Sequence, residues 1–255
     1  MDVPNAKENS VNLYKDGNNV GGFIRNPGVK TDDIEYLMER NEFGSYTVDV
    51  TAFADIEVGF ENGETSRDEG MRKMELRTER LVLRPWRESD AESLYEYAKD
   101  PSVGPIAGWA VHTSVEYSLN IIRNALSAPE TYAVCLKEDN KAIGSIGLMI
   151  GESSNIDIPE TEGEIGYWIG VPFWGQGLIP EAVREIIRYA FGELKLAKLW
   201  CGYFDGNIKS KRVQEKCGFT YHHTEVDKPW PHIGEARTEH ITCLSREQWE
   251  MKLRL

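Results

Sequence analysis

Apolar and polar residues follow two regular patterns in the middle of this chain, and together they predict a strand, a turn and a helix. The run EIGYWIGV, residues 164–171, alternates in the way typical of a strand. From Pro180 onward, apolar residues recur every three or four positions, which predicts an amphipathic helix; they are Val183, Ile186, Ile187, Ala190, Phe191 and Leu194. Gly175 and Gly177 lie between the two patterns and predict a tight turn there.

Similar patterns predict further strands and helices on both sides of this unit. Strand-like runs cover residues 80–85, 131–137, 142–150, 198–205, 220–226 and 236–244, and a turn at 138–141 joins the second run to the third. Capping boxes at Ser89–Glu92 and Thr113–Glu116 predict two helices before residue 131. Asn207 and Gly218 predict the start and the end of a short helix. The expected order is therefore β-α-α-β-β-β-α-β-α-β-β.

Residues 1–73 differ from the rest of the chain in charge and in pattern. They are more acidic per residue, and they contain a strand-like run at 46–53, a helix-like run at 32–41 and turn signals at 16–17 and 62–63. A polar stretch at 61–73 reads as a linker, so we place a domain boundary at Met74. We expect an acidic N-terminal extension or small appended module of unknown function, followed by one domain at 74–255.

Composition places the chain among ordinary globular proteins. With 255 residues, 40% of them hydrophobic, the chain can bury a full core. No run approaches the roughly 18 apolar residues of a membrane helix, and the first ten residues lack the features of a signal peptide, so we expect a cytoplasmic protein without a membrane partner. The net charge of −13 argues against nucleic acid as a partner and is compatible with the attraction of cationic amines.

The four cysteines do not form a recognisable ligand or disulfide pattern. Cys135, Cys201, Cys217 and Cys243 lack the C-x-x-C or Cys/His spacing of a metal site. We therefore expect free thiols and no bound metal.

The turn before the amphipathic helix has the chemistry of an anion site. Glycines on both sides of Gln176 let backbone N–H groups approach a ligand closely, because no Cβ atom stands in the way. The helix that follows adds partial positive charge at its N-terminus. Pro180 costs little there, since an N–H in the first turn has no partner within the helix. The arrangement suits a phosphate or pyrophosphate.

A second motif begins about thirty residues later. From Asn207 the chain reads NIKSKRVQEKCGF, an N-x-x-S-x-x-V-x-x-K-x-G-F pattern. Together with WGQGLIPEA at residues 174–182 and the opening MELRTERLVLRPWRESDAESLYEYAKDP at 74–101, it resembles the GNAT N-acetyltransferase superfamily, specifically the branch of the ribosomal-protein N-terminal acetyltransferases. The resemblance covers roughly residues 74–250. Trp174 and Ile179 depart from it, since the family's loop has Gln or Arg and Gly or Ala at these positions.

The resemblance implies a fold and an activity. The expected fold is α/β of the α+β type, a mixed and mostly antiparallel sheet flanked by helices. The expected activity is direct transfer of an acetyl group from acetyl-CoA to a primary amine, either a protein N-terminus, which the branch slightly favours, or a small molecule. No metal and no covalent acyl-enzyme are expected, and the protein is expected to be a monomer or a homodimer. A non-catalytic acyl-CoA-binding or interaction module is the alternative.

The same resemblance assigns residues to acetyl-CoA. Backbone groups of Ile169 and Val171 are expected to pair with the amides of pantetheine. The pyrophosphate is expected on the turn, whose residues are Trp174, Gly175, Gln176, Gly177 and Leu178. Asn207 is expected to bond the cofactor, to cap its helix, or to do both. Lys209, Lys211 and Arg212 either meet the cofactor's phosphates or form a solvated helix face.

Two residues are candidates for proton transfer. Glu164 begins the strand before the turn and is the first candidate for the general base, with Glu162 and Glu160 as substitutes; a solvated charge at the strand end is the alternative. Ser210 matches a family serine near the cofactor sulfur and either donates a proton to the departing thiolate or bonds backbone N–H groups at a helix start. A peptide α-amine, with a pKa of about 8, needs less help from a base than a lysine amine, with a pKa of about 10.4.

Aromatic residues are the candidates for an acceptor pocket. Trp109, Trp168, Trp230 and Tyr167 either line it or pack in the core. Residues 229–232, PWPH, are expected in a long loop beside the acceptor site. His112 is expected to be a loop or cap residue rather than a base.

Overall fold

A computed structural model describes residues 9–15, 18–25, 46–51, 75–230 and 234–253. The chain forms two compact units, Met1–Arg67 and Asp68–Leu255. In the first unit, strands β1 (Asn9–Lys15), β2 (Asn18–Arg25) and β3 (Tyr46–Thr51) form an antiparallel sheet in the order β2-β1-β3. β3 lies within the strand-like run expected at 46–53. The helix expected at 32–41, the turns at 16–17 and 62–63 and the linker at 61–73 lie outside the described residues.

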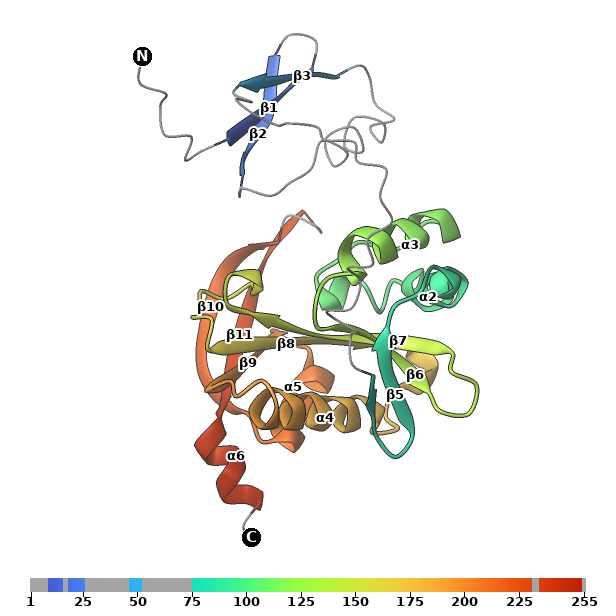
Figure 1. Ribbon diagram of the computed structural model, residues 1–255, viewed down its shortest axis with the longest axis vertical. Coiled ribbons are helices and arrows are strands. Elements are labelled where there is room, and N and C mark those ends of the chain that lie inside the picture. The colour runs from blue at the N-terminus through green and yellow to red at the C-terminus, as the bar shows by residue number, and fades with distance from the viewer. Residues whose placement is uncertain (1–8, 16–17, 26–45, 52–74, 231–233, 254–255) are drawn as a thin grey trace, which may run out of the picture. The chain divides into compact units, whose positions relative to one another are not determined.

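The second unit is built on one mixed sheet (Figure 1). Its strands are β4 (Leu76–Arg77), β5 (Leu81–Pro85), β6 (Thr131–Leu136), β7 (Ala142–Ile150), β8 (Glu162–Ile169), β9 (Lys198–Phe204), β10 (Thr220–Trp230) and β11 (Glu235–Ser245). Their order across the sheet is β10-β11-β9-β8-β7-β6-β5-β4. Neighbouring strands are antiparallel except for β8 and β9, which are parallel. The expected mixed, mostly antiparallel sheet is confirmed.

Helices cover both faces of this sheet (Figure 1). α2 (Ala91–Ala98) and α3 (Val115–Ile121) pack on one face, and α4 (Leu178–Gly192) and α5 (Ile208–Cys217) on the other, while α6 (Arg246–Leu253) follows the last strand. Short helical turns occupy Glu88–Asp90, Pro105–Ala107, Ile122–Leu126, Gly151–Ser153 and Val171–Phe173. The chain order of the predicted elements is confirmed, whereas β4 and α6 were not predicted.

Strand alternation places the two largest core clusters on opposite faces of the sheet. On β5, Leu81 and Leu83 pack with α4, whereas Val82 packs with α2 on the opposite face. The apolar stripe predicted for the helix after Pro180 is confirmed, because Ile186 and Phe191 of α4 are almost fully buried. Each such side chain stabilises the fold by roughly 1.5–3 kcal/mol through burial. The central strands are thus held from both sides.

Three predicted local features differ from the structure. α2 begins at Ala91, so Asp90 rather than Ser89 precedes it. The Asp90 carboxylate does not cap α2; it forms a buried ion pair with Arg84 at 2.7 Å and accepts a 2.9 Å bond from the Arg87 N–H. α3 is capped by Ser114 rather than Thr113; the Ser114 hydroxyl accepts a 3.0 Å bond from the N–H of Tyr117.

The loop expected at 229–232 is the third difference. Pro229 and Trp230 belong to β10, the edge strand of the sheet, and the remaining two residues lie outside the described part. An edge strand tolerates proline, since one of its sides has no neighbouring strand to receive an N–H.

Candidate active site

The parallel strands β8 and β9 pair only at their beginnings. Their register runs from Glu162↔Lys198 to Glu164↔Trp200 and stops there. β8 continues along β7 as far as Ile169, and β9 continues along β11 as far as Phe204, so the two strands diverge. A cavity of about 1130 Å³ opens at this gap, large enough for a cofactor and part of a second molecule.

Residues from both faces of the sheet line this cavity. Glu164, Gly166 and Trp168 alternate along β8 with Ile165, Tyr167 and Ile169, and all six are lining residues. The cavity therefore reaches through the plane of the sheet, from the side of α4 and α5 to the side of α2 and α3. Two molecules entering from opposite faces would meet at the gap.

The turn before α4 forms one wall of the cavity. Gly175 and Gly177 have φ angles of 76° and 79°, in the left-handed region that favours glycine. A Cβ atom added at Gly175 would meet nothing within 4 Å, and one at Gly177 would meet only the Arg80 Nη2 atom at 3.7 Å. Gly177 is also the N-cap of α4 and provides no side-chain cap for the helix. The wall therefore presents open backbone and the positive end of a helix dipole, as an anion requires.

The two departures from the family loop have structural roles. The indole Nε1 of Trp174 donates a 2.9 Å bond to the carbonyl oxygen of Ile169, which fastens the turn to the end of β8. Ile179 is 6% exposed and packs in the core under the first turn of α4. The Ile169 carbonyl thus already accepts one bond, and a carbonyl oxygen can accept a second, as the expected bond from pantetheine would require.

Val171 and Gln176 are not brought into the cavity lining. The carbonyl of Val171 accepts a 3.1 Å bond from the Trp174 N–H, and the side chain of Gln176 donates to the carbonyl of Pro172 at 2.9 Å. Arg80 stabilises the back of the turn, since its Nη1 atom donates to the Gln176 carbonyl at 3.1 Å. The other expected cofactor residues do line the cavity: Ile169, Trp174, Gly175, Gly177, Leu178, Asn207 and Ser210.

Basic side chains of α5 lie on the same wall. Lys209, Arg212 and Lys216 line the cavity, and the Nζ atom of Lys209 lies 3.3 Å from the centre of the Trp174 ring. Lys211, also expected there, instead pairs with Glu215 on the surface. Lys216 was not predicted, although it belongs to the same motif.

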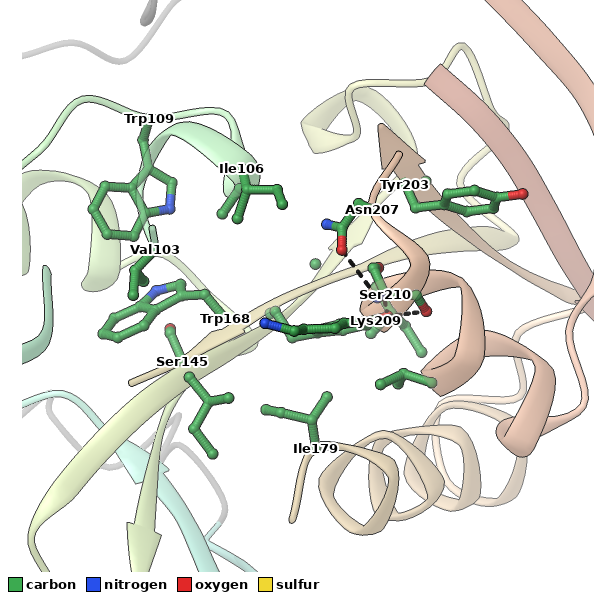
Figure 2. A pocket seen from close by; sticks show the side chains of 18 of the residues that line it. Val103, Ile106, Trp109, Ser145, Trp168, Ile179, Tyr203, Asn207, Lys209 and Ser210 are labelled. Carbon is green, nitrogen blue, oxygen red and sulfur yellow. Dashed lines mark hydrogen bonds between the residues drawn. The ribbon is translucent and has the colours of Figure 1, made fainter. Parts of the chain in front are cut away.

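Ser210 lies at the start of α5, beside Asn207 (Figure 2), and its hydroxyl is close to the half-buried phenol of Tyr167. The side chain of Asn207 caps the helix by accepting a 3.1 Å bond from the Ser210 N–H. The hydroxyl of Ser210 lies 2.9 Å from the Tyr167 hydroxyl and 3.3 Å from Gln214 Nε2. Burial raises the pKa of Tyr167 well above its usual value, so the phenol keeps its proton at neutral pH. The pair is a chain of two hydroxyl groups able to pass a proton.

Glu164 is a buried carboxylate rather than a solvated charge. It is 5% exposed, and its Oε2 atom accepts 2.8 Å bonds from the Ser154 hydroxyl and from the Asn155 N–H. Glu162, by contrast, accepts a bond from the indole of Trp200, and Glu160 accepts one from the N–H of Glu152. Of the three candidate bases, Glu164 alone lines the cavity.

A second buried carboxylate lines the cavity and was not predicted. Glu239 of β11 is 5% exposed, and its Oε2 atom lies 2.9 Å from the Nζ atom of Lys228. Burial is the main cause that raises the pKa of Glu239; Lys228 opposes this shift, and the nearby charge of Glu164 adds to it. No local motif marks Glu239, because strand pairing alone brings it to the gap.

Aromatic rings form the wall on the side of α2 and α3. The rings of Trp109 and Trp168 meet edge to face with centres 5.5 Å apart, and those of Phe204 and Trp230 do the same at 4.9 Å. Figure 2 shows Trp109 and Trp168 on the side of the cavity opposite Ser210. The expectation that Trp109, Trp168, Trp230 and Tyr167 line a pocket agrees with this geometry.

His112 is a buried residue of the same wall. It lies in the loop before α3, as expected, and its Nδ1 atom is 2.8 Å from the Ser118 hydroxyl. Burial lowers its pKa to about 4, so the ring is neutral at physiological pH.

The cysteine thiols are free and protonated at neutral pH. Burial raises the pKa of Cys217 to about 11, that of Cys135 to about 12 and that of Cys201 well above its usual value. Among the described residues, no group of three His, Cys, Asp or Glu side chains is placed to hold a metal ion. Nor does any helix in the described part have the length and apolar character to cross a membrane.

The chain is similar to several known acetyltransferases. Residues 80–220 match the family described as the acetyltransferase (GNAT) domain. The chain is 33% identical to the N-acetyltransferase p20 of Bacillus licheniformis over 149 residues, which cover 56% of this chain and 81% of p20. It is 45% identical over 81 residues to YdaF of Bacillus subtilis (strain 168), named as a ribosomal N-acetyltransferase; the match covers 32% of this chain and 42% of YdaF.

A solved structure matches a longer part of the chain. The GNAT-family acetyltransferase from Bacillus anthracis has a TM-score of 0.60 and 26% sequence identity to this chain. The match covers 68% of this chain and 99% of that structure.

Proposed function

This chain belongs to the GNAT acetyltransferase family and is an N-acetyltransferase, and on that premise we propose that it moves an acetyl group from acetyl-CoA directly to a primary amine at the gap between β8 and β9. The observation that carries the proposal is the cavity that crosses the sheet, with open glycine backbone on one side and a buried carboxylate on the other.

The side of α4 and α5 is the place for acetyl-CoA, which supplies the acetyl group as a thioester. The open turn at Gly175 and Gly177 offers backbone N–H groups to its pyrophosphate. Lys209, Arg212 and Lys216 add positive charge from α5. Between them these groups neutralise phosphate and hold the cofactor along the diverging edge of β8.

Glu164 is proposed as the base on the opposite side. One of its oxygens is held by Ser154 and Asn155, which fixes the carboxylate at the cavity wall. A carboxylate held in place accepts a proton from an amine with little reorganisation. Burial excludes bulk water from this carboxylate and strengthens its attraction for an ammonium group.

Ser210 and Tyr167 are proposed to return a proton to the departing sulfur. Their hydroxyls are 2.9 Å apart, and the high pKa of the phenol keeps both of them able to donate. A thiol has a pKa of about 8.5 and leaves with little help, so this assistance is small compared with positioning.

The state of the cysteines supports direct transfer. A thiol reacts as its thiolate, and burial disfavours the thiolate of Cys201, whose thiol donates a 3.1 Å bond to the carbonyl of Ile165 at the start of the gap. Cys201, which lines the cavity, is therefore not a ready nucleophile to carry an acetyl group between the two substrates.

A protein N-terminus is the proposed acceptor, ahead of a small-molecule amine. The α-amine of a peptide has a pKa of about 8 and loses its proton far more readily than a lysine side chain, whose pKa is about 10.4. YdaF, named as a ribosomal N-acetyltransferase, points to the same class.

Release of free CoA thiol tests this proposal. The protein is incubated with acetyl-CoA and three acceptors: a peptide with a free N-terminus, the same peptide with a blocked N-terminus and one lysine, and a simple primary amine. We expect release with the free N-terminus at least tenfold faster than with the blocked peptide. Tight binding of CoA without release for any acceptor would instead support a non-catalytic acyl-CoA-binding module.

A further inference from the structure

Glu239 of β11 reaches the gap because the neighbouring strand β9 has a glycine, Gly202, where a side chain would block it. Glu239 is paired with Phe204 across β11 and β9, and its side chain lies over Gly202, the residue two positions earlier on the same face. A Cβ atom at Gly202 would stand 2.1 Å from the Oε1 atom of Glu239, closer than any real contact. Glycine at 202 is therefore what allows this carboxylate to lie at the cavity.

One oxygen of this carboxylate is fixed and the other is not. Oε2 lies 2.9 Å from the ammonium of Lys228, which also lies 2.7 Å from Glu225 of β10. Oε1 makes no hydrogen bond within the described part of the chain, although the side chain is about nineteen-twentieths buried. Glu239 lines the cavity, so this oxygen is available to accept a hydrogen bond from a ligand there.

The two buried carboxylates belong to one connected network. The N–H of Asn155 donates to Glu164 at 2.8 Å, and the carbonyl of the same residue accepts a 3.3 Å bond from Lys228. The carboxylates of Glu225 and Glu239 share the ammonium of Lys228, and Asn155 links this group to the carboxylate of Glu164. With all of these groups ionised, the network carries an excess of negative charge, and a cation placed between Glu164 and Glu239 would reduce it.

We propose that Glu239 and Glu164 together form an anionic subsite that binds the ammonium group of the acceptor before its proton is removed. The proposal rests on the proposed acetyl transfer and names the acceptor's charge: the amine arrives as a cation, with an apolar neighbouring group. The rings of Phe204 and Trp230, packed edge to face beside Glu239, provide the surface for that neighbouring group. Lys228 is a positioning residue, which holds Glu239 through its other oxygen.

The test compares a cation with a neutral molecule of the same shape. 2-Phenylethylamine and 2-phenylethanol are titrated into the protein saturated with CoA, and heat of binding is recorded. Wild-type protein should bind the amine more tightly than the alcohol. Glu239→Gln should lower the affinity for the amine by about tenfold to a hundredfold, the range expected for loss of one charged hydrogen bond. Its affinity for the alcohol and for CoA should stay within about threefold.

Glu225→Gln is the matched control, because it removes a charge from the same Lys228 network without touching the cavity lining. It should leave amine binding within about threefold of wild type. If Glu239→Gln does not fold, Gly202→Ala is tested in its place. Its methyl group would displace the Glu239 carboxylate and should cause the same selective loss of affinity for the amine.

Several results would overturn the subsite. They are equal binding of amine and alcohol by wild type, unchanged amine binding in Glu239→Gln, or an equal loss in Glu225→Gln. Failure of the acetyl transfer itself has a different signature: the amine still binds in preference to the alcohol, but no acceptor causes release of CoA.

Discussion

Gly177 is the position where the smallest substitution tests the cofactor turn. Its φ angle is 79°, so an alanine there strains the backbone and costs roughly 1–2 kcal/mol of stability. The protein itself leaves room for the methyl group, whose nearest neighbour would be Arg80 at 3.7 Å. Any clash must therefore come from a ligand that lies against the turn. Loss of one charge-assisted bond to a phosphate weakens binding by roughly 1.5–3 kcal/mol, about tenfold to a hundredfold.

Gly234→Ala separates the effect on the ligand from the effect on the backbone. Gly234 has a φ angle of 68°, and an added Cβ atom there would also meet nothing within 4 Å, but the residue does not line the cavity. Thermal unfolding should show a similar loss of stability in both variants. Calorimetric titration with CoA should show weaker binding only in Gly177→Ala. Equal CoA affinity in the two variants would refute the placement of the pyrophosphate on this turn.

Three further predictions concern stability, proton transfer and the N-terminal segment. Burial lowers the pKa of His112 to about 4 from 6.5, so the unfolded chain binds the proton more tightly and the free energy of unfolding falls by roughly 3 kcal/mol between pH 7 and pH 4. Urea unfolding at each pH should show that His112→Asn lacks this part of the pH dependence. If the free energies of unfolding of wild type and variant differ by the same amount at every pH, the prediction is contradicted. Ser210→Ala should lower kcat by about tenfold to a hundredfold, near the lower limit for general acid catalysis, with nearly unchanged acetyl-CoA affinity in stopped-flow and binding assays, and full kcat would leave solvent as the proton donor. A chain beginning at Met74 should fold and release CoA thiol at a rate comparable to the full chain, and an insoluble product, or loss of acceptor use, would show that the boundary at 73/74 is wrong.

Local patterns in the sequence predicted the elements whose determinants are themselves local. Strand β7 has the bounds expected from its apolar run, and α4 follows from glycine, proline and the apolar stripe within fifteen residues. Features that depend on distant partners were missed. The capping box predicted at Ser89–Glu92 is one example: Asp90 instead accepts a 2.9 Å bond from the Arg87 N–H and pairs with Arg84, which is 2% exposed.

In the candidate site, too, the residues predicted from the sequence are those that belong to contiguous motifs. The glycine turn and the Asn207 motif are contiguous in sequence, and both line the cavity as expected. Glu239 was missed because its place depends on β11 lying beside β9, and on Gly202 leaving space for a carboxylate. Neither condition is visible without the order of strands across the sheet.

The most direct test of acetyl transfer in one step is the dependence of the initial rate on both substrates. The initial rate of CoA release is measured over a grid of acetyl-CoA and free-N-terminus peptide concentrations. In a separate experiment, the mass of the intact protein is measured by mass spectrometry after incubation with acetyl-CoA alone. Direct transfer predicts intersecting double-reciprocal lines and a protein of unchanged mass. Parallel lines together with an acetylated protein would contradict it, and would show that a side chain carries the acetyl group between the two substrates.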